Sequence, residues 1–344
     1  MIKINNQTIF NYNKTPLLIA EISGNHGGNK KRFLKLITSA CKNGADLIKI
    51  QTYEPEDITL NIKNNNFKIT KGIWKNKYLW DLYKEASTPF EWHKEAFKIA
   101  KKYKKVLFSS PFSERAVDFL EKFKVPLYKI ASFEITDLKL INYIASKRKP
   151  IIISTGMATN QEIKNAINEI NKYHKKIIIL HCVSGYPTEL KDINLNKIFS
   201  LKKEFKKYLI GLSDHTDDIY SSIAANFYQP VLIEKHFKLN EKITTTDSLF
   251  SITPDKLKKL KKTLNELNYK THRKKIDIEK TSKKLRRSIF SIKDIETNEK
   301  FSKKNIGTFR PKVGLCSSKF YKVLGKKTKK KIKSGTPIKY SHFL

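Results

Sequence analysis

Two stretches, Leu209-Ile210-Gly211-Leu212-Ser213-Asp214-His215 and Leu232-Ile233-Glu234-Lys235-His236, indicate the fold of this protein most directly. Each is a short apolar run that ends in polar residues and a histidine, and residues 219–227 between them have a helical pattern. Apolar runs without polar alternation are typical of parallel strands that are buried on both faces. The segment therefore predicts a strand–helix–strand unit with one histidine at the end of each strand.

The same unit repeats along the first part of the chain. About eight strand–helix units in roughly 250 residues are the size and rhythm of an α/β protein built as a (β/α)8 TIM barrel. An open, doubly wound sheet is the alternative, but no Gly-x-Gly-x-x-Gly follows the first strand. The remaining predicted strands are Leu17–Ile22, Asp46–Gln51, Val106–Ser110, Tyr128–Ala131, Ile151–Ser154 and Ile177–Cys182, and the other predicted helices are Lys30–Lys42, Pro89–Lys102, Glu114–Phe123, Leu138–Ser146, Asn160–Tyr173, Asn194–Phe205 and Pro254–Leu267.

The pattern changes after the last of these helices. We expect a catalytic barrel over residues 1–267, a charged linker over 268–284 and a small β-rich domain over 285–344. A module of that size is marginally stable alone and often packs on a partner surface. A long insertion after the second strand, Glu54–Ser87, is expected to form a lid or rim over the barrel mouth.

Composition limits the remaining classes of protein. The 344 residues carry a formal net charge of +38, which would suit a nucleic-acid partner, but the lysines are scattered and suit compositional bias better. The three cysteines are far apart, the N-terminus lacks a signal-peptide pattern, and no apolar run is long enough to span a bilayer. We therefore expect a cytoplasmic protein that binds neither nucleic acid nor membrane.

Polar residues stand at nearly every predicted strand end. In a TIM barrel these ends converge on one mouth, where barrel enzymes carry out their chemistry. They include Glu21, Lys49, Gln51, Ser109, Ser110, Lys129, Ser132, Glu134, Ser154, His181, Ser184, Ser213, His215, Lys235 and His236.

His215 and His236 end consecutive strands, which in a sheet lie about 5 Å apart, so both imidazoles can reach one metal ion. Imidazole nitrogen suits Mn²⁺, Fe²⁺ or Zn²⁺, and two protein ligands leave positions for water and substrate. Two buried, hydrogen-bonded histidines are the alternative interpretation. Glu21 is a candidate general acid or base.

Two lysines, Lys49 and Lys129, are expected at the same mouth. Ammonium groups surrounded by hydroxyls suit a phosphate or carboxylate ligand, whereas a Schiff-base lysine, as in an aldolase-type lyase, is the alternative. The serines expected around them are Ser110, Ser132, Ser154, Ser184 and Ser213.

These motifs together resemble the sialic acid synthase (NeuB-like) family over essentially the whole chain. The matching stretches are Ala20–His26, Gly44–Tyr53, Phe108–Phe112, Tyr128–Glu134, Ser154–Thr159, Gly211–His215 and Ile233–Phe237. The resemblance implies that phosphoenolpyruvate lies on the lysines and serines, and that His215 and His236 hold a divalent metal, Mn²⁺ or alternatively Mg²⁺ or Co²⁺. It also implies that Gln51, Glu134, Tyr186 and Asp247 orient an N-acetylated sugar.

The tail is similar to the antifreeze-like (SAF) domain of the same family. Arg287-Ser288, Phe309-Arg310-Pro311 and Leu324–Lys327 carry this resemblance. It implies a domain-swapped homodimer in which Arg310 reaches the partner's sugar site.

Within the family, residues 71–83 and 88–93 look most like the pseudaminic acid synthases. The resemblance implies condensation of phosphoenolpyruvate with 2,4-diacetamido-2,4,6-trideoxy-L-altrose, which gives a nonulosonic acid and phosphate. An N-acetylneuraminic or legionaminic acid synthase, acting on a different hexosamine, is the alternative.

Overall fold

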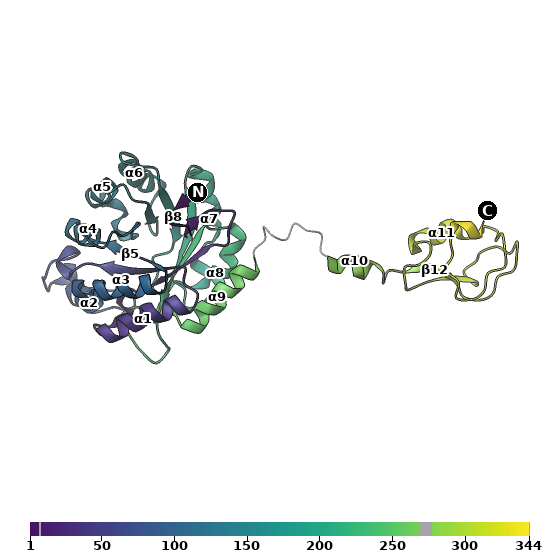
Figure 1. Cartoon of the computed structure of the whole chain (residues 1–344), viewed down its shortest axis with the longest axis horizontal. Coiled ribbons are helices and arrows are strands. Elements are labelled where there is room, and N and C mark those ends of the chain that lie inside the picture. Colours follow the sequence, from purple (N-terminus) through teal and green to yellow (C-terminus); the bar gives the residue numbers. More distant parts are fainter. Residues whose placement is uncertain (7, 268–276, 344) are drawn as a thin grey trace. The chain divides into compact units, whose positions relative to one another are not determined.

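The computed structural model describes residues 1–6, 8–267 and 277–343. The chain divides into two compact units, Met1–Asn268 and Tyr269–Leu344 (Figure 1). Of the predicted linker, residues 268–276 lie outside the described residues, and Asp277–Lys283 form helix α10. The linker prediction did not include this helix.

The first unit is built on a ring of parallel strands. Neighbouring strands pair in register from β3 to β10, and β10 pairs with both β9 and β3, so the sheet is closed. This closure confirms the predicted (β/α)8 barrel and excludes the open sheet. The barrel strands are β3 (Leu17–Glu21), β4 (Leu47–Thr52), β5 (Val106–Pro111), β6 (Tyr128–Ile130), β7 (Ile151–Ser154), β8 (Ile177–Cys182), β9 (Leu209–Asp214) and β10 (Leu232–Phe237), and the short β11 (Ser251–Ile252) pairs with β10.

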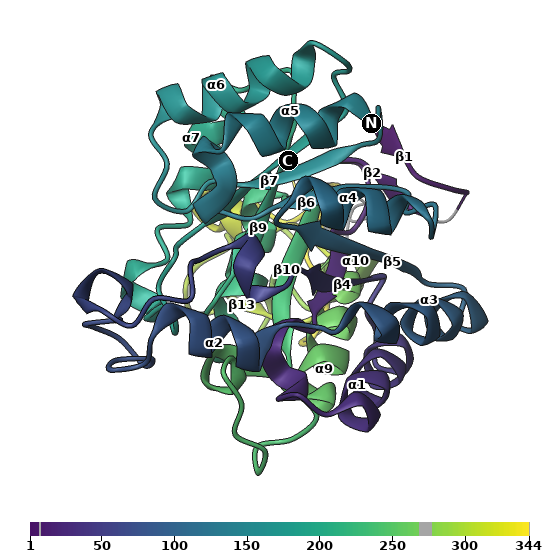
Figure 2. The ribbon, with the colours of Figure 1, turned by 90° about the vertical axis from the view of Figure 1, so that its left-hand side faces the viewer.

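Helices surround this ring (Figure 2). Each presents an apolar stripe to the strands, as α1 does with Phe33, Leu36, Ile37 and Ala40 at helical spacing. Helix α6 begins at a capping box, in which the Thr159 hydroxyl accepts from the Glu162 backbone N–H. The helices of this unit are α1 (Lys30–Lys42), α2 (Leu79–Ala86), α3 (His93–Lys102), α4 (Glu114–Glu121), α5 (Leu138–Ser146), α6 (Asn160–Asn171), α7 (Asn196–Glu204), α8 (Tyr220–Ala225) and α9 (Pro254–Glu266).

An antiparallel hairpin that the sequence did not predict closes the N-terminal end of the barrel. It consists of β1 (Ile2–Lys3) and β2 (Ile9–Phe10). Phe10 is fully buried in a cluster with residues from the first halves of the strands, such as Leu47 and Leu209. The ligand-accessible end is therefore the opposite one, at the C-terminal strand ends.

Strand alternation sends some of the predicted mouth residues outward. Lys235 lies between the strands and the helices, where its ammonium is 3.4 Å from Asp214 and donates to the Thr216 carbonyl at 2.6 Å. Ser109 donates to the Ile50 carbonyl, and the His181 ring bonds to the Ile193 carbonyl. The expectation that these three side chains share the mouth was wrong, because successive side chains of a strand point to opposite faces.

The second unit is a small β-rich fold, as predicted. Strands β12 (Ser288–Ser291) and β13 (Ile306–Phe309) pair antiparallel, and a single turn of helix, α11 (Phe320–Val323), follows. Asn298 adopts φ +66°, a left-handed turn conformation that asparagine tolerates. Its core consists of Ile289, Ile295, Phe301, Ile306, Leu315, Val323, Ile332, Ile338 and Phe343.

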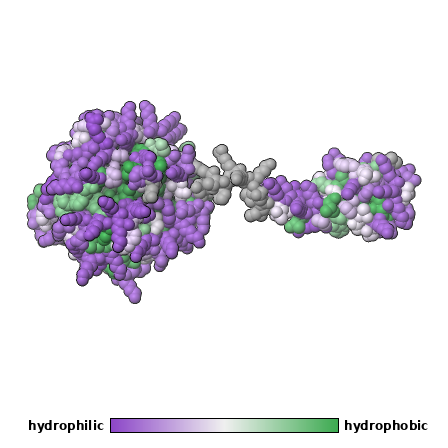
Figure 3. Space-filling model, viewed as in Figure 1, coloured by the Kyte–Doolittle hydropathy of each residue, from purple (hydrophilic) through white to green (hydrophobic). Residues whose placement is uncertain are grey.

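The visible surface of both units is mainly hydrophilic, with smaller apolar patches between charged residues (Figure 3). Among the helices of the described residues, none is long and apolar enough to cross a membrane.

The buried Lys235–Asp214 pair predicts a large stability effect. Replacing Lys235 by Ala leaves the Asp214 carboxylate buried without its cation, and should lower the free energy of unfolding by about 3–5 kcal/mol. Lys164→Ala, which breaks an exposed 2.6 Å pair with Glu204, should cost less than about 1 kcal/mol. Urea denaturation of both variants measures the difference; equal losses would contradict a structural role for the buried pair.

Candidate active site

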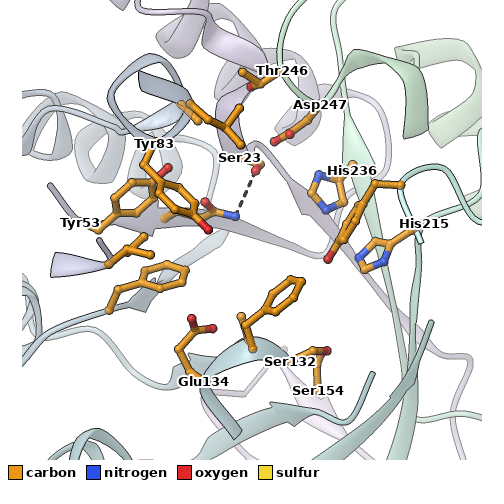
Figure 4. A pocket seen from close by; sticks show the side chains of 18 of the residues that line it. Ser23, Tyr53, Tyr83, Ser132, Glu134, Ser154, His215, His236, Thr246 and Asp247 are labelled. Atoms are coloured by element: carbon orange, nitrogen blue, oxygen red, sulfur yellow. Dashed lines mark hydrogen bonds between the residues drawn. The ribbon is translucent and has the colours of Figure 1, made fainter. Parts of the chain in front are cut away.

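A cavity of about 320 Å³ lies at the C-terminal ends of the barrel strands (Figure 4). His215 and His236 stand on one side of it, Tyr53 and Tyr83 on the opposite side, and Ser132, Glu134 and Ser154 below. The predicted site residues that line it are Gln51, Lys129, Ser132, Glu134, Ser154, Tyr186, Ser213, His215, His236 and Asp247.

Two buried lysines and two buried carboxylates form the polar base of this site. The Lys129 ammonium lies 3.0 Å from Glu234 Oε1, and Lys49 lies 3.5 Å from the same oxygen and 2.8 Å from Glu21 Oε2. The Ser213 hydroxyl also donates to Glu234 Oε1, at 3.1 Å. Strand register brings them together, because Glu21 pairs with Lys49 on one side and His236 on the other.

We call Lys49, Lys129, Glu21 and Glu234 the quartet. Its two carboxylates, Glu21 and Glu234, have pKa values shifted in opposite directions. Burial raises the pKa of Glu21 above its ordinary value in spite of Lys49, which lowers it. Burial also raises the pKa of Glu234, but Lys129 and Lys49 outweigh it and hold that pKa well below its usual range. Glu234 is therefore the permanent counter-ion, and Glu21 is the group that can carry a proton.

The predicted serines approach each other around one glycine. Gly156 N–H donates to Ser132 Oγ at 3.1 Å, and a Cβ at Gly156 would lie 2.1 Å from Ser184 Oγ. The hydroxyls of Ser110, Ser154 and Ser184 are buried and have no hydrogen-bond partner in the described part of the chain. Buried hydroxyls normally have partners, so this group is suited to an oxygen-rich ligand.

The two histidines face each other with ring centroids 5.3 Å apart. His215 Nδ1 bonds to the Val183 carbonyl at 2.9 Å, which fixes that nitrogen as the donor and leaves Nε2 as the acceptor. Burial, followed by the nearby His215, lowers the pKa of His236 well below its usual range, so its ring is neutral. Its Nδ1 has no hydrogen-bond partner among the described residues. A neutral ring and a free lone pair fit a metal ligand.

The structure describes no set of three or more His, Cys, Asp or Glu side chains placed to hold a metal ion, within residues 1–6, 8–267 and 277–343. A metal here would rely on the two histidines and on non-protein ligands, and the predicted metal site stays a prediction.

The four residues expected to orient a sugar lie around the cavity wall. Gln51 Nε2 donates to Glu21 Oε1 at 3.2 Å and to Ser23 Oγ at 3.0 Å, so it links the wall to the quartet. Asp247 Oδ2 accepts from the Gly24 N–H at 2.9 Å, and the Tyr186 ring packs 4.6 Å from the His215 ring. The Glu134 carboxyl points toward the cavity.

Five predicted site residues do not line the cavity. Glu21, Lys49, Ser110 and Ser184 are buried or half-buried residues outside the lining, although Glu21 and Lys49 are bonded to residues that line it. Arg310 belongs to the second unit, where it borders a groove with Arg286 and Arg287. The structure does not place this unit relative to the barrel.

Glu234 and the apolar cavity wall were not predicted from the sequence as parts of the site. Glu234 was quoted as part of a motif but received no role, although it stands two residues before His236 and must share its face of the strand. The wall comes from the insertion after β4, where apolar residues such as Trp74 carry no strand-end signal. The expectation that the insertion covers the mouth agrees with its presence in the cavity lining.

The fold and the site define a (β/α)8-barrel enzyme with a charged cavity at the C-terminal strand ends. The chain belongs to the NeuB family, whose profile matches residues 36–275, and the SAF domain matches residues 286–344.

Curated relatives and a solved structure agree with this assignment. The pseudaminic acid synthase of Campylobacter jejuni is 40% identical over 97% of this chain and 98% of its own length. The N,N'-diacetyllegionaminic acid synthase of the same species is 33% identical over 95% of this chain and 99% of its own. The crystal structure of an N-acetylneuraminic acid synthetase from Leptospira borgpetersenii matches with a TM-score of 0.69 at 27% identity, over 78% of this chain and 91% of that one.

Glu134 gives the site a measurable pH dependence. Burial raises its pKa from 4.5 to about 7, so the folded state favours the protonated carboxyl more than the unfolded state does. The stability that this provides is fully present below about pH 4.5 and is lost as the pH rises through about 7. Glu134→Gln should therefore be more stable than the wild type at pH 8, by roughly 2 kcal/mol given the partial exposure of the carboxyl, and similar at pH 4.5.

Urea denaturation of both proteins between pH 4.5 and 8 tests this. Parallel stability curves for the wild type and the variant would show that Glu134 is not the titrating group.

Proposed function

We propose that this protein condenses phosphoenolpyruvate with an N-acetylated sugar to give a nonulosonic acid and phosphate. The observation that carries the proposal is the buried Lys49–Glu234–Lys129 bridge beside hydroxyls without partners, facing two convergent imidazoles. Ammonium and hydroxyl groups suit the phosphate and carboxylate of one substrate, and the histidines mark where the other substrate reacts.

Phosphoenolpyruvate would lie on the cavity floor. Lys129, Ser132, Ser154 and Ser213 line the cavity and contact its anionic groups directly. Lys49 does not line the cavity but forms an ion pair with Glu234, which does. When Glu21 is protonated, the two lysines and Glu234 together carry one uncompensated positive charge. Excess positive charge at a buried cavity base favours an anionic substrate over a neutral one.

His215 and His236 would hold a divalent cation, for which we propose Mn²⁺, with Mg²⁺ or Co²⁺ as the alternatives. The neutral ring of His236, its Nδ1 without a partner among the described residues, and the convergence of the two rings support this ligand set. When bound, the cation supplies Lewis-acid polarisation of the sugar aldehyde.

The reaction then balances as follows. C3 of phosphoenolpyruvate forms a bond to the aldehyde carbon, and the aldehyde oxygen takes a proton. Water adds to C2, the C2–O bond to phosphate breaks, and phosphate leaves as the ketone forms. Glu21 is the candidate for proton exchange, and its hydrogen bond from Gln51 and its ion pair with Lys49 hold it next to the residues that line the cavity. Gln51, Glu134, Tyr186 and Asp247 orient the sugar.

We propose 2,4-diacetamido-2,4,6-trideoxy-L-altrose as the sugar and pseudaminic acid as the product. The name of the 40% identical Campylobacter jejuni relative and the likeness of residues 71–93 to pseudaminic acid synthases support this choice. A legionaminic or N-acetylneuraminic acid synthase activity is the alternative, which the 33% identical relative supports.

The absence of a disulfide among Cys41, Cys182 and Cys316 in the described residues supports a reducing, cytoplasmic location.

We further propose that the second unit swaps onto a partner barrel in a homodimer, where Arg310 meets the sugar. Its guanidinium borders an open groove of the second unit, and the small core of that unit supports a need for a partner surface.

Phosphate release tests the reaction. The purified protein, with phosphoenolpyruvate, Mn²⁺ and the diacetamido sugar, should release phosphate, and His236→Ala should reduce the rate about 1,000-fold. His174→Ala, a histidine on the barrel exterior, is the matched control and should leave the rate unchanged. Phosphate release at the wild-type rate by His236→Ala would remove the metal proposal.

The same assay separates the alternatives. Phosphate release with N-acetylmannosamine or a legionaminic precursor in place of the altrose sugar would reassign the acceptor. An aldolase-type lyase is the second candidate, because burial lowers the pKa of Lys129 and so eases the loss of the proton that precedes imine formation. Borohydride trapping of substrate on Lys129 or Lys49 would support that reaction and contradict ours.

Subunit mixing tests the swapped arginine. Arg310→Ala and His236→Ala should each be nearly inactive, but a co-expressed, doubly tagged heterodimer contains one site with both residues intact. It should recover about half of the wild-type activity per dimer. A heterodimer as inactive as its parents would show that Arg310 does not act across subunits.

A further inference from the structure

The cavity has two chemically different sides. Its base and the histidine side carry lysine, carboxylate, hydroxyl and imidazole groups from the strand ends. Much of the remaining lining comes from the insertion between β4 and α3, which places Tyr83 opposite the histidines (Figure 4). We call this set the insertion wall; it consists of Ile58, Ile69, Trp74, Leu79, Leu82 and Tyr83.

The insertion wall offers little to a polar ligand. Four of its members are aliphatic, and the Trp74 indole N–H is already bonded to the Thr246 carbonyl at 2.9 Å. The Tyr83 hydroxyl is the remaining polar side-chain group of this set. A ligand hydroxyl against Ile69, Leu79 or Leu82 would therefore lose its water without gaining a partner.

Local contacts hold the wall in place. The Ile69 backbone accepts from the Asn76 N–H at 2.8 Å and donates to the Lys77 carbonyl at 2.9 Å, so this residue sits in a closed turn. Trp74 packs its ring 5.5 Å from Tyr186 and 6.2 Å from Phe250, and its bond to Thr246 ties the insertion to the segment after β10. Backbone hydrogen bonds at Ile69 and ring contacts at Trp74 thus hold the wall in place.

We infer that the insertion wall selects an acceptor sugar by its methyl groups: Ile69, Leu79, Leu82 and Trp74 favour a 6-deoxy, N-acetylated sugar over the same sugar with a C6 hydroxyl. The inference rests on the proposed function, because the sugar must share the cavity with phosphoenolpyruvate on the polar base. With its reacting aldehyde at the histidines, the sugar can place C6 and an acetamido methyl against these apolar side chains, which line the same cavity.

A single-atom comparison tests this. The acceptors are 2,4-diacetamido-2,4,6-trideoxy-L-altrose and the same sugar carrying a C6 hydroxyl, and the readout is the ratio of their kcat/KM values for phosphate release. The wild type should prefer the deoxy sugar at least about tenfold, the scale of discrimination that an apolar pocket gives for a small group.

Ile69→Thr keeps the branched shape and introduces a hydroxyl, and should reduce this preference by about tenfold. Ile73→Thr is the matched control, since Ile73 lies in the same turn but is 38% exposed and is not in the cavity lining. It should leave the preference unchanged. Trp74→Phe should raise KM for both sugars while largely retaining the preference, because it removes the Thr246 bond but keeps an apolar ring.

Different results would contradict the proposed function and the proposed role of the insertion wall. If the wild type releases no phosphate with either sugar, the proposed function fails. If the wild type turns over the deoxy sugar but Ile69→Thr and Ile73→Thr give the same preference, the reaction stands and the insertion wall does not select the acceptor.

Discussion

Two ammonium groups buried at the centre of the barrel share one carboxylate, and the rest of the site depends on that arrangement. Lys129 and Lys49 lie 3.0 Å and 3.5 Å from the same oxygen of Glu234, and Glu21 completes the set beside Lys49. Taking ionisable groups out of water is costly, and only close opposite charges and hydrogen bonds offset that cost. The barrel supplies this geometry through the registers of β3, β4, β6 and β10.

This constraint also separates the site into regions with different chemistry. The strands are rigid and in fixed register, so they carry the groups that must be placed within tenths of an ångström. The insertion after β4 is less constrained by the sheet and carries shape and apolar surface instead. A site that binds an anion and an acylated sugar together needs both kinds of surface.

Strand alternation explains where prediction from sequence succeeded and where it did not. The barrel, the positions of its eight strands and its main helices followed from apolar runs and amphipathic stretches, and most boundaries lie within two residues of those observed. The polar strand ends were identified correctly as a group, but Lys235 and His181 were assigned to the wrong face, and Glu234 was not assigned at all. A list of polar strand ends does not separate inward from outward side chains unless the phase of each strand is known.

The sequence by itself determined the fold class, the family resemblance and the residue types available at the mouth, because these depend on local periodicity and on motifs a few residues long. Tertiary structure alone decided which of those residues meet. The Lys49–Glu234–Lys129 bridge, the facing imidazoles and the insertion wall each join residues far apart in the chain. Such contacts arise only when the ring of strands closes, since closure fixes every register relative to the others.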